Sequence, residues 1–232
     1  MRNVTKISSI LTLSLLAACG ASTEDENLAP EGDGTDTTAE DQVDVEEGEV
    51  VGIIGRNGAG KSTLMKGLAG IMEPIEGKIA ISGKRRKHLA YLPQQSEIDR
   101  SFPISVSNLV AMGLWSKIGA FGALGKKELA SVSEALAAVS LTGFEKRSIN
   151  MLSGGQFQRA LFARILLQDA ALILLDEPFA AIDLKTMADL IRIILGWHQE
   201  GCTVAVVLHD HEIVNEHFPD TLMIARELVA HG

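Results

Sequence analysis

The stretch GRNGAGKST, residues 55–63, has the residue types and the spacing of a phosphate-binding loop. Gly55, Gly60, Lys61 and Ser62 fill the pattern G-x-x-x-x-G-K-[ST]. Glycines let backbone N–H groups wrap around phosphates, the lysine reaches the terminal phosphates, and the serine hydroxyl ligates Mg²⁺. The stretch therefore predicts a site for ATP and Mg²⁺. Its expected nucleotide-binding residues are Gly55, Asn57, Gly58, Gly60, Lys61, Ser62 and Thr63.

A second group of reactive residues ends the apolar run AALILLDEP, residues 170–178. Six consecutive apolar residues bounded by acids are typical of a parallel strand that is covered on both faces. Open α/β sheets bind ligands at the carboxyl ends of their strands, so Asp176 and Glu177 should lie near the phosphates. Asp176 is expected to ligate Mg²⁺, and Glu177 to act as the base or to position water. The alternative is that both acids only cap the next helix.

A third element, MLSGGQFQRALFARILL at residues 151–167, predicts a helix whose N-terminus can bind an anion. Ser153 is a typical capping residue, and the two glycines after it expose the first turn. One chain has little use for two anion sites, whereas two chains facing head to tail would use one from each. A homodimer is therefore expected. The residues offered to the partner's nucleotide would be Ser153, Gly154, Gly155 and Gln156.

The elements that must position these residues alternate between strand and helix. EVVGIIG, residues 49–55, indicates a buried strand, and LMKGLAGIM, residues 64–72, has apolar residues at helical spacing. A strand before the loop and a helix after it are the context that the phosphate-binding motif requires. The predicted fold class is thus α/β, a P-loop domain with a mainly parallel sheet. A glycine-rich turn without a nucleotide is the alternative.

Length and charge bound the possible partners. The chain of 232 residues is long enough for one sizeable domain. Its formal net charge of −9 is concentrated in residues 20–50, which contain 12 acidic residues and no Lys or Arg. The remaining chain is close to neutral, so no nucleic-acid partner is expected.

The first nineteen residues have the layout of a lipoprotein signal. Arg2 and Lys6 precede an apolar run, and Cys19 follows small residues, as a lipid-modified cysteine would. Residues 20–45 contain almost no large apolar side chain and are expected to form an acidic, disordered linker. The alternatives are a short helix with a buried cysteine and an acidic tail that buffers metal ions.

Taken together, the motifs resemble the nucleotide-binding subunit of ABC transporters. LSGGQ, residues 152–156, is similar to the signature sequence of that family. Gln94 in YLPQQ matches the loop glutamine that senses magnesium and contacts the permease. Asp183 matches the loop after the catalytic strand, and His209 matches the switch histidine near the γ-phosphate. The resemblance thus implies Glu177, His209 and Gln94 as catalytic residues, Asp183 as a nucleotide-site residue, and Ser62, Gln94 and Asp176 as Mg²⁺ ligands.

A further pattern is similar to the ATPases of zinc and manganese importers. The pattern D-x-x-FP-x-[ST]-V is present at Asp99, Phe102, Pro103 and Val106. The resemblance implies a subunit that hydrolyses ATP to power import of a divalent metal ion, with zinc favoured over manganese and chelated iron. It also implies an integral-membrane permease and an extracytoplasmic metal-binding protein as partners. A helical subdomain at about 97–150 would dock on the permease.

The N-terminal part departs from that family. Its members carry two strands and an adenine-stacking aromatic residue before the loop, whereas this chain has no aromatic residue before Tyr91. The N-terminal antiparallel strands are therefore expected to be truncated. An importer ATPase works at the cytoplasmic face of the inner membrane, but a lipoprotein signal exports its chain. We therefore interpret the chain as a lipoprotein start fused to an ATPase domain at 46–232. The alternatives are a tethered lipoprotein with a non-catalytic remnant and an ABC ATPase outside transport.

Overall fold

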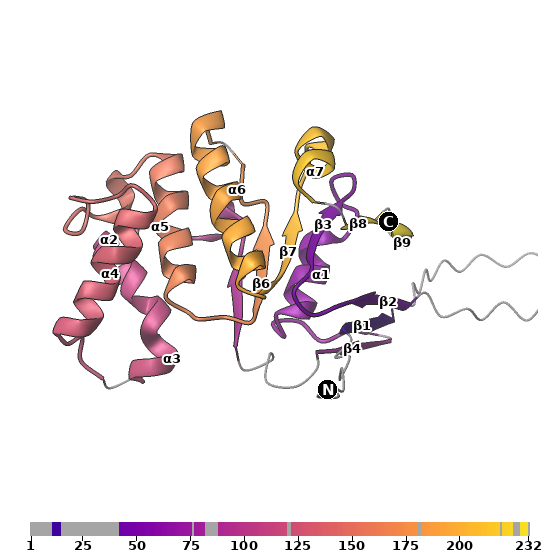
Figure 1. Ribbon diagram of the computed structural model, residues 1–232, viewed down its shortest axis with the longest axis horizontal. Helices are drawn as coiled ribbons and strands as arrows, with labels where there is room; N and C mark the ends of the chain where they lie inside the picture. Colours follow the sequence, from indigo (N-terminus) through magenta and orange to yellow (C-terminus); the bar gives the residue numbers. More distant parts are fainter. Residues whose placement is uncertain are drawn as a thin grey trace, which may run out of the picture.

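The structure is a computed structural model that describes most of the chain after residue 41. The described residues are 11–14, 42–75, 77–81, 88–119, 122–180, 182–218, 220–224 and 228–231. Figure 1 shows a central sheet with helices packed on it, a group of helices at one end, and a smaller sheet below α1.

The central sheet has six strands in the spatial order β5-β6-β7-β3-β8-β9. The strands are β3 (Val50–Ile54), β5 (Leu89–Leu92), β6 (Leu172–Asp176), β7 (Thr203–Val207), β8 (Asp220–Ile224) and β9 (Leu228–His231). All neighbours pair in parallel except β8 and β9, which are antiparallel. The strands β3 and β6 are buried at every residue, as expected for parallel strands covered on both faces. The predicted α/β fold is confirmed.

Helices cover both faces of this sheet, and successive residues of a strand point to opposite faces. In β6, Leu174 packs in one core cluster with Met65 of α1 (Lys61–Leu68), whereas Leu175 packs in the other with the helices α5 and α6. Helix α5 spans Gly154–Leu166, α6 spans Leu184–Gln199, and the short α7 spans His211–His217. The two clusters explain why the strands carry continuous rather than alternating apolar residues.

The residues from 95 to 151 form a group of helices beside the sheet (Figure 1). The helices are α2 (Val106–Ala111), α3 (Trp115–Ile118) and α4 (Lys126–Ala138). The 3₁₀ turns are η2 (Gln95–Glu97), η3 (Met112–Leu114) and η4 (Ile149–Met151). Val106, Val132 and Leu136 bury against Phe157 and Leu161 of α5, so this group packs on the helix that begins at the signature.

A small antiparallel sheet in the order β2-β1-β4 lies beside the central one. Its strands are β1 (Leu11–Ser14), β2 (Gln42–Val45) and β4 (Lys78–Ala80). The sequence interpretation assigned residues 11–14 to a signal segment and residues 42–45 to an unstructured linker, and the structure has a short strand at each place. LTLS and QVDV each alternate apolar and polar residues, the period of a half-buried strand, and Val45 is buried in the core. Two short strands therefore do precede the loop, so this sheet is abbreviated rather than lost.

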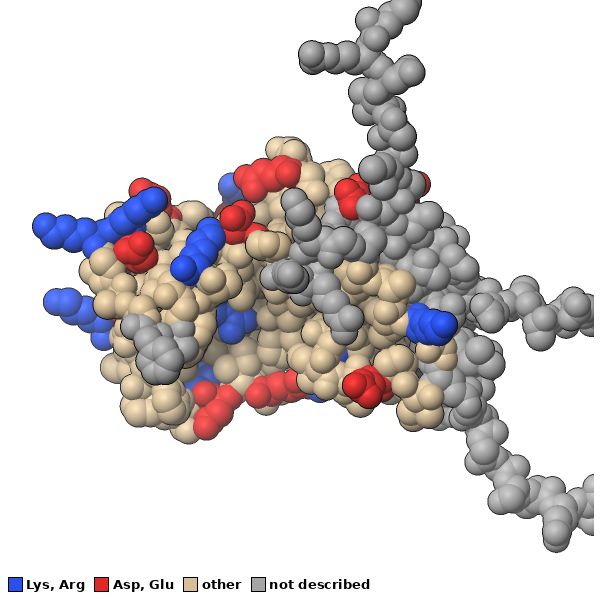
Figure 2. Space-filling view, turned by 90° about the horizontal axis from the view of Figure 1, so that it is seen from below, with Lys and Arg blue, Asp and Glu red and all other residues tan. Residues whose placement is uncertain are grey.

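The remaining N-terminal predictions lie outside the described residues. They include the Cys19 lipidation site and residues 20–41 of the linker. No described helix is long and apolar enough to cross a bilayer. Figure 2 shows side chains of both charges on one face of the molecule, with Lys and Arg gathered toward the end that carries α2, α3 and α4.

Candidate functional site

The loop between β3 and α1 is shaped by its glycines. A Cβ on Gly55 would lie 2.1 Å from the carbonyl oxygen of Ile224, so only glycine fits there. Gly58 and Gly60 have φ values of 79° and 97°, in the region that glycine adopts without steric cost. Gly60 caps α1 and, as a glycine, makes no side-chain capping bond to that helix. The helix N-terminus is therefore available to an anion.

Lys61 is buried and lies over the loop that precedes it. The residue is only 5% exposed, and its Nζ donates to the carbonyl oxygens of Gly55 at 2.8 Å and Arg56 at 3.1 Å. The loop borders a cavity of about 460 Å³, within the size range of small-molecule sites. The residues that line it are Asn57, Gly58, Gly60, Lys61, Ser62, Thr63, Gln94, Glu177 and His209.

Asp176 ends β6 next to this cavity and is 1% exposed. Neither of its carboxylate oxygens has a hydrogen-bond partner among the described residues. Burial, followed by the nearby Glu177, raises the pKa of Asp176, and the nearby Ser62 and Gln94 side chains oppose that rise. A buried carboxylate without a partner, beside a serine hydroxyl, is an oxygen donor set that fits Mg²⁺. The residues present therefore match the predicted metal.

Glu177 is held at the centre of a polar network. Its Oε1 accepts a hydrogen bond from Gln94 Nε2 at 2.8 Å and lies 2.5 Å from His209 Nε2. Gln94 Nε2 also donates to Ser62 Oγ at 3.2 Å. Glu177 has a φ of 50°, which is unusual for a residue with a side chain and is often found at functional sites. The network brings together residues from four separate parts of the sequence.

The signature residues lie apart from this cavity. Ser153 Oγ accepts a hydrogen bond from the Gln156 amide at 3.3 Å, and Gln156 Oε1 accepts one from the Ser153 amide at 3.1 Å. This reciprocal pair is a capping box, which satisfies the helix start within one chain. The structure thus separates the predicted site residues into two groups. The second group contains Ser153, Gly154, Gly155 and Gln156, none of which lines the cavity.

Asp183 belongs to this second group. It caps α6, and its carboxylate accepts hydrogen bonds from the amide and the hydroxyl of Thr186, both at 2.8 Å. Those bonds lower the pKa of Asp183, which is exposed. Its Oδ2 would lie 3.8 Å from a Cβ placed on Gly155, so Asp183 and the signature residues are neighbours.

Several residues that the sequence interpretation missed connect the two groups. Gln95 Nε2 donates to Gln158 Oε1 at 2.6 Å and to the Gly154 carbonyl at 3.2 Å. On the other side of the same segment, Glu97 pairs with Lys66 of α1 at 2.7 Å. The segment after Gln94 therefore bridges the phosphate-loop helix and the signature helix. A polar residue on the buried face of α5, the 2% exposed Gln158, was the one available signal.

Comparison with known proteins gives a family and a fold. The sequence profile of the family described as ABC transporter matches residues 39–180. The manganese transport system ATP-binding protein MntB of Listeria monocytogenes is 43% identical over 192 residues, which cover 81% of this chain and 80% of that protein. The zinc transport system ATP-binding protein TroB of Treponema pallidum is 39% identical over 194 residues, which cover 82% of this chain and 73% of that protein.

Two solved structures have a similar fold. One is described as a metal-chelate type ABC transporter in an inward-facing conformation, with a TM-score of 0.76 and 28% identity, covering 97% of this chain and 82% of the other. The second is a bacterial ABC transporter cassette solved as a dimer, with a TM-score of 0.72 and 27% identity, covering 82% of this chain and 88% of the other.

Proposed function

Because the chain belongs to the ABC transporter family, we propose that it binds and hydrolyses MgATP to power the import of a divalent metal ion, zinc or manganese. The observation that carries the proposal is the cavity beside the phosphate-binding loop. Lys61, Ser62 and Glu177 line one polar space, with Asp176 buried next to it. A base, a cation and an oxygen donor set for Mg²⁺ around a phosphate site are the parts that phosphoryl transfer requires.

The groups of this chain have separate tasks in the proposed reaction. The free amides at the start of α1 and the Lys61 ammonium bind the phosphate oxygens. Ser62 and Asp176 would hold Mg²⁺, which would supply neutralisation of the charge that develops on the phosphates. Glu177 accepts a proton from the attacking water or orients that water, and His209 stabilises the γ-phosphate. Gln94 contacts both Ser62 and Glu177, so it would link the magnesium site to the base.

The proposed active form is a head-to-tail homodimer. The residues Ser153–Gln156 and Asp183 lie outside the cavity of their own chain, and a structurally similar cassette was solved as a dimer. In the proposed dimer, the signature of one chain closes over the nucleotide held by the loop of the other. The capping box then opens enough for the Ser153 hydroxyl and the first amides of α5 to contact phosphate.

The proposed partners are an integral-membrane permease and an extracytoplasmic metal-binding protein, with the chain at the cytoplasmic face of the inner membrane. Support comes from relatives whose names describe manganese and zinc transport systems. The sequence interpretation favoured zinc, but the relatives named for manganese support that ion equally. The permease and the binding protein select the ion, because the ATPase does not contact it.

The test has two stages that use the full chain. Equilibrium binding and hydrolysis of MgATP are measured for the wild type and for Lys61→Ala. The proposal predicts binding and turnover in the wild type and their loss in the variant. Uptake of radioactive zinc and of radioactive manganese by cells carrying each form then identifies the cargo. Equal, slow hydrolysis in both proteins would contradict the proposed activity.

The sequence around Cys19 supports a second proposal, a lipid-anchored chain with a non-catalytic ATPase remnant. Support comes from the basic start, the apolar run and the small residues before that cysteine. Mass spectrometry of the N-terminus of the protein isolated from cells tests it. Lipid on Cys19 with residues 1–18 removed would support the anchored form, and an intact N-terminus with ATP turnover would contradict it.

A further inference from the structure

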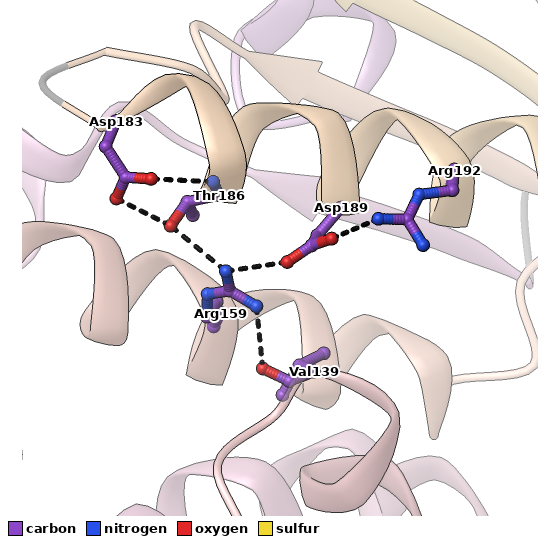
Figure 3. Close-up of polar contacts among 6 residues, drawn as sticks. All are labelled: Val139, Arg159, Asp183, Thr186, Asp189 and Arg192. Atoms are coloured by element: carbon purple, nitrogen blue, oxygen red, sulfur yellow. Dashed lines mark hydrogen bonds and ion pairs between the residues drawn. The ribbon is translucent and has the colours of Figure 1, made fainter.

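Arg159 lies on the signature helix and reaches into the neighbouring helix α6 (Figure 3). Its Nη2 donates to Asp189 Oδ2 at 2.9 Å and to Thr186 Oγ1 at 3.1 Å. Its Nη1 donates to the carbonyl oxygen of Val139, at the end of α4, at 3.2 Å. One guanidinium therefore joins three elements: α4, α5 and α6.

Thr186 in turn contacts Asp183, the residue that the family resemblance matches to the loop after the catalytic strand. The Thr186 hydroxyl accepts from Arg159 and donates to Asp183 Oδ2 at 2.8 Å, and Asp183 caps the helix through the Thr186 amide (Figure 3). Thr186 is 5% exposed, so the hydrogen bonds of its hydroxyl to Arg159 and Asp183 are partly shielded from water. Arg159 and Thr186 each lie three residues after a proposed dimer-contact residue, Gln156 and Asp183 respectively.

A planar guanidinium suits this position better than an ammonium. It presents several donors in a fixed fork, and the three acceptors here come from different directions. The Arg159 side chain is 12% exposed and that of Asp189 is 23% exposed, so their interaction is less screened than that of a surface ion pair. The geometry therefore fixes the start of α5 relative to the start of α6.

The helices α5 and α6 also pack through apolar contacts that do not involve this network. The rings of Phe162 and Trp197 stack with their centroids 5.7 Å apart, and both residues belong to the main core. Removing the guanidinium should therefore leave the two helices packed. What it removes is the restraint at their N-terminal ends, where Ser153–Gln156 and Asp183 lie.

We propose that Arg159 is a positioning residue that holds the signature residues and Asp183 as one rigid unit, so that both meet the partner chain's nucleotide together. The inference rests on the proposed function, because it assigns the unit to the site completed by a second copy of the chain. Arg159 itself contacts no residue that lines the nucleotide cavity in the described interactions. Its effect is therefore expected on turnover and not on nucleotide binding by the loop.

Arg192 supplies a matched control. It is an arginine that also pairs with Asp189, but it lies on α6 itself and its side chain is 74% exposed. Arg192→Ala therefore removes an ion pair to the same carboxylate without disconnecting α5 from α6. Arg159→Lys keeps the charge and can satisfy only part of the network, which makes it the conservative variant.

The experiment compares wild type, Arg159→Ala, Arg159→Lys and Arg192→Ala by MgATP binding and by kcat and KM of hydrolysis. Arg159→Ala is expected to bind MgATP within about twofold of wild type and to lose roughly tenfold to a hundredfold in kcat, the range caused by misplacing a binding group by an ångström. Arg159→Lys should be intermediate, and Arg192→Ala should match wild type. A kcat for Arg159→Ala within twofold of wild type, or an equal loss in Arg192→Ala, would overturn the proposal.

Hydrogen exchange gives a readout that is independent of activity. In Arg159→Ala, the amides of Gln156 and Thr186 should exchange faster than in wild type, while those of β6 keep their protection. Unchanged exchange at both positions would overturn the inference even if the wild type hydrolyses no ATP. A wild type without turnover but with the expected exchange pattern would instead count against the proposed function alone. Thermal unfolding followed by circular dichroism separates both outcomes from simple misfolding of the variant.

Discussion

The two helix starts that the sequence marked as anion sites differ in how they are satisfied. At α1 the capping residue is Gly60, which makes no side-chain capping bond, and the buried Lys61 points back over the loop. At α5 the exposed Ser153 and the half-buried Gln156 cap the helix reciprocally. The first amides of α1 therefore lack a capping side chain and can bind an anion, whereas the start of α5 is capped within its own chain.

The side chains around the two helix starts also differ. Around α1 lie Asp176, Glu177 and His209, the proposed metal ligand, base and γ-phosphate contact. Around α5, Gln95, Arg159 and Asp183 make contacts that fix the helix and carry out no chemistry themselves. After their proposed roles, we call the surroundings of the α1 start the reactive region and those of the α5 start the presented region. Their separation within one chain is the structural reason to expect function from two chains.

The largest expected effect is at the reactive region, with Lys61→Ala. Because the ammonium is the buried cation of the cavity, its removal should abolish detectable MgATP binding and lower hydrolysis by about 10²–10³-fold or more. Isothermal titration calorimetry and phosphate release measure the two effects. Binding with unchanged affinity in the variant would show that the loop is not the nucleotide site.

The next effect is expected for Glu177→Gln, which keeps the shape of the side chain and removes its basicity. It should affect hydrolysis alone, whereas Lys61→Ala also loses nucleotide binding. Hydrolysis should fall by about 10²–10⁴-fold, the contribution typical of a positioned base, while MgATP binding is retained. Phosphate release and calorimetry on the same preparation provide the measurement. A variant that retained wild-type turnover would remove Glu177 from the proposed mechanism.

Ser153→Ala tests the presented region and should have an intermediate effect. The loss of one cap is expected to cost about 1 kcal/mol of folding free energy, so the variant should remain folded. Binding of MgATP by the loop should be unchanged, and turnover should fall by roughly tenfold because one phosphate contact is lost. Steady-state kinetics at saturating MgATP measure the change. A loss of binding instead would mean that the two regions are not separable as described.

The smallest predicted effect concerns stability and pH. Burial raises the pKa of Asp176 in the folded chain, so its contribution to stability is greatest below the usual aspartate pKa and is lost as pH rises through the raised value. Asp176→Asn should therefore raise Tm in the absence of nucleotide, increasingly so as the pH approaches neutrality. A change on the order of 1 kcal/mol corresponds to roughly 2–4 °C for a chain of this size.

The same variant should lose the stabilisation that Mg²⁺ and ATP give to the wild type, because a neutral amide is a poorer ligand for that cation. Thermal unfolding at several pH values, with and without MgATP, measures both effects. A lower Tm for Asp176→Asn without nucleotide would contradict the view that this carboxylate is unsatisfied until the metal binds.

The reactive region was largely predictable from sequence, because its motif is contiguous and its neighbours are unambiguous. A glycine-rich stretch between a buried strand and a helix places Lys61 and Ser62, and the end of an apolar run places Asp176. The contact of Glu177 with His209 depends on the neighbouring positions of β6 and β7 in the sheet. For that contact the family resemblance, rather than residue spacing, supplied the prediction.

The contacts that connect separate helices and loops around α5 could not be predicted in the same way. Gln95 meets Gln158, and Arg159 meets Asp189, across elements that are far apart in sequence. A polar residue in a helix predicts that a partner exists but not which one. β1 was missed for a different reason, since LTLS lies within an apolar run that also suits a signal segment. Whether a segment forms a strand depends on the strand that it pairs with. The four residues of β1 do not identify that neighbour.

The most direct test of the central claim mixes two impaired variants of the full chain, Lys61→Ala and Ser153→Ala. In a head-to-tail dimer that contains one chain of each variant, one site combines the intact loop with the intact signature. The other site combines both defects. If chains exchange freely, about half of the dimers are mixed and each has one sound site, so turnover should approach roughly a quarter of wild type by this statistical count and exceed both parents. Turnover equal to the average of the two parents would contradict a site shared between chains.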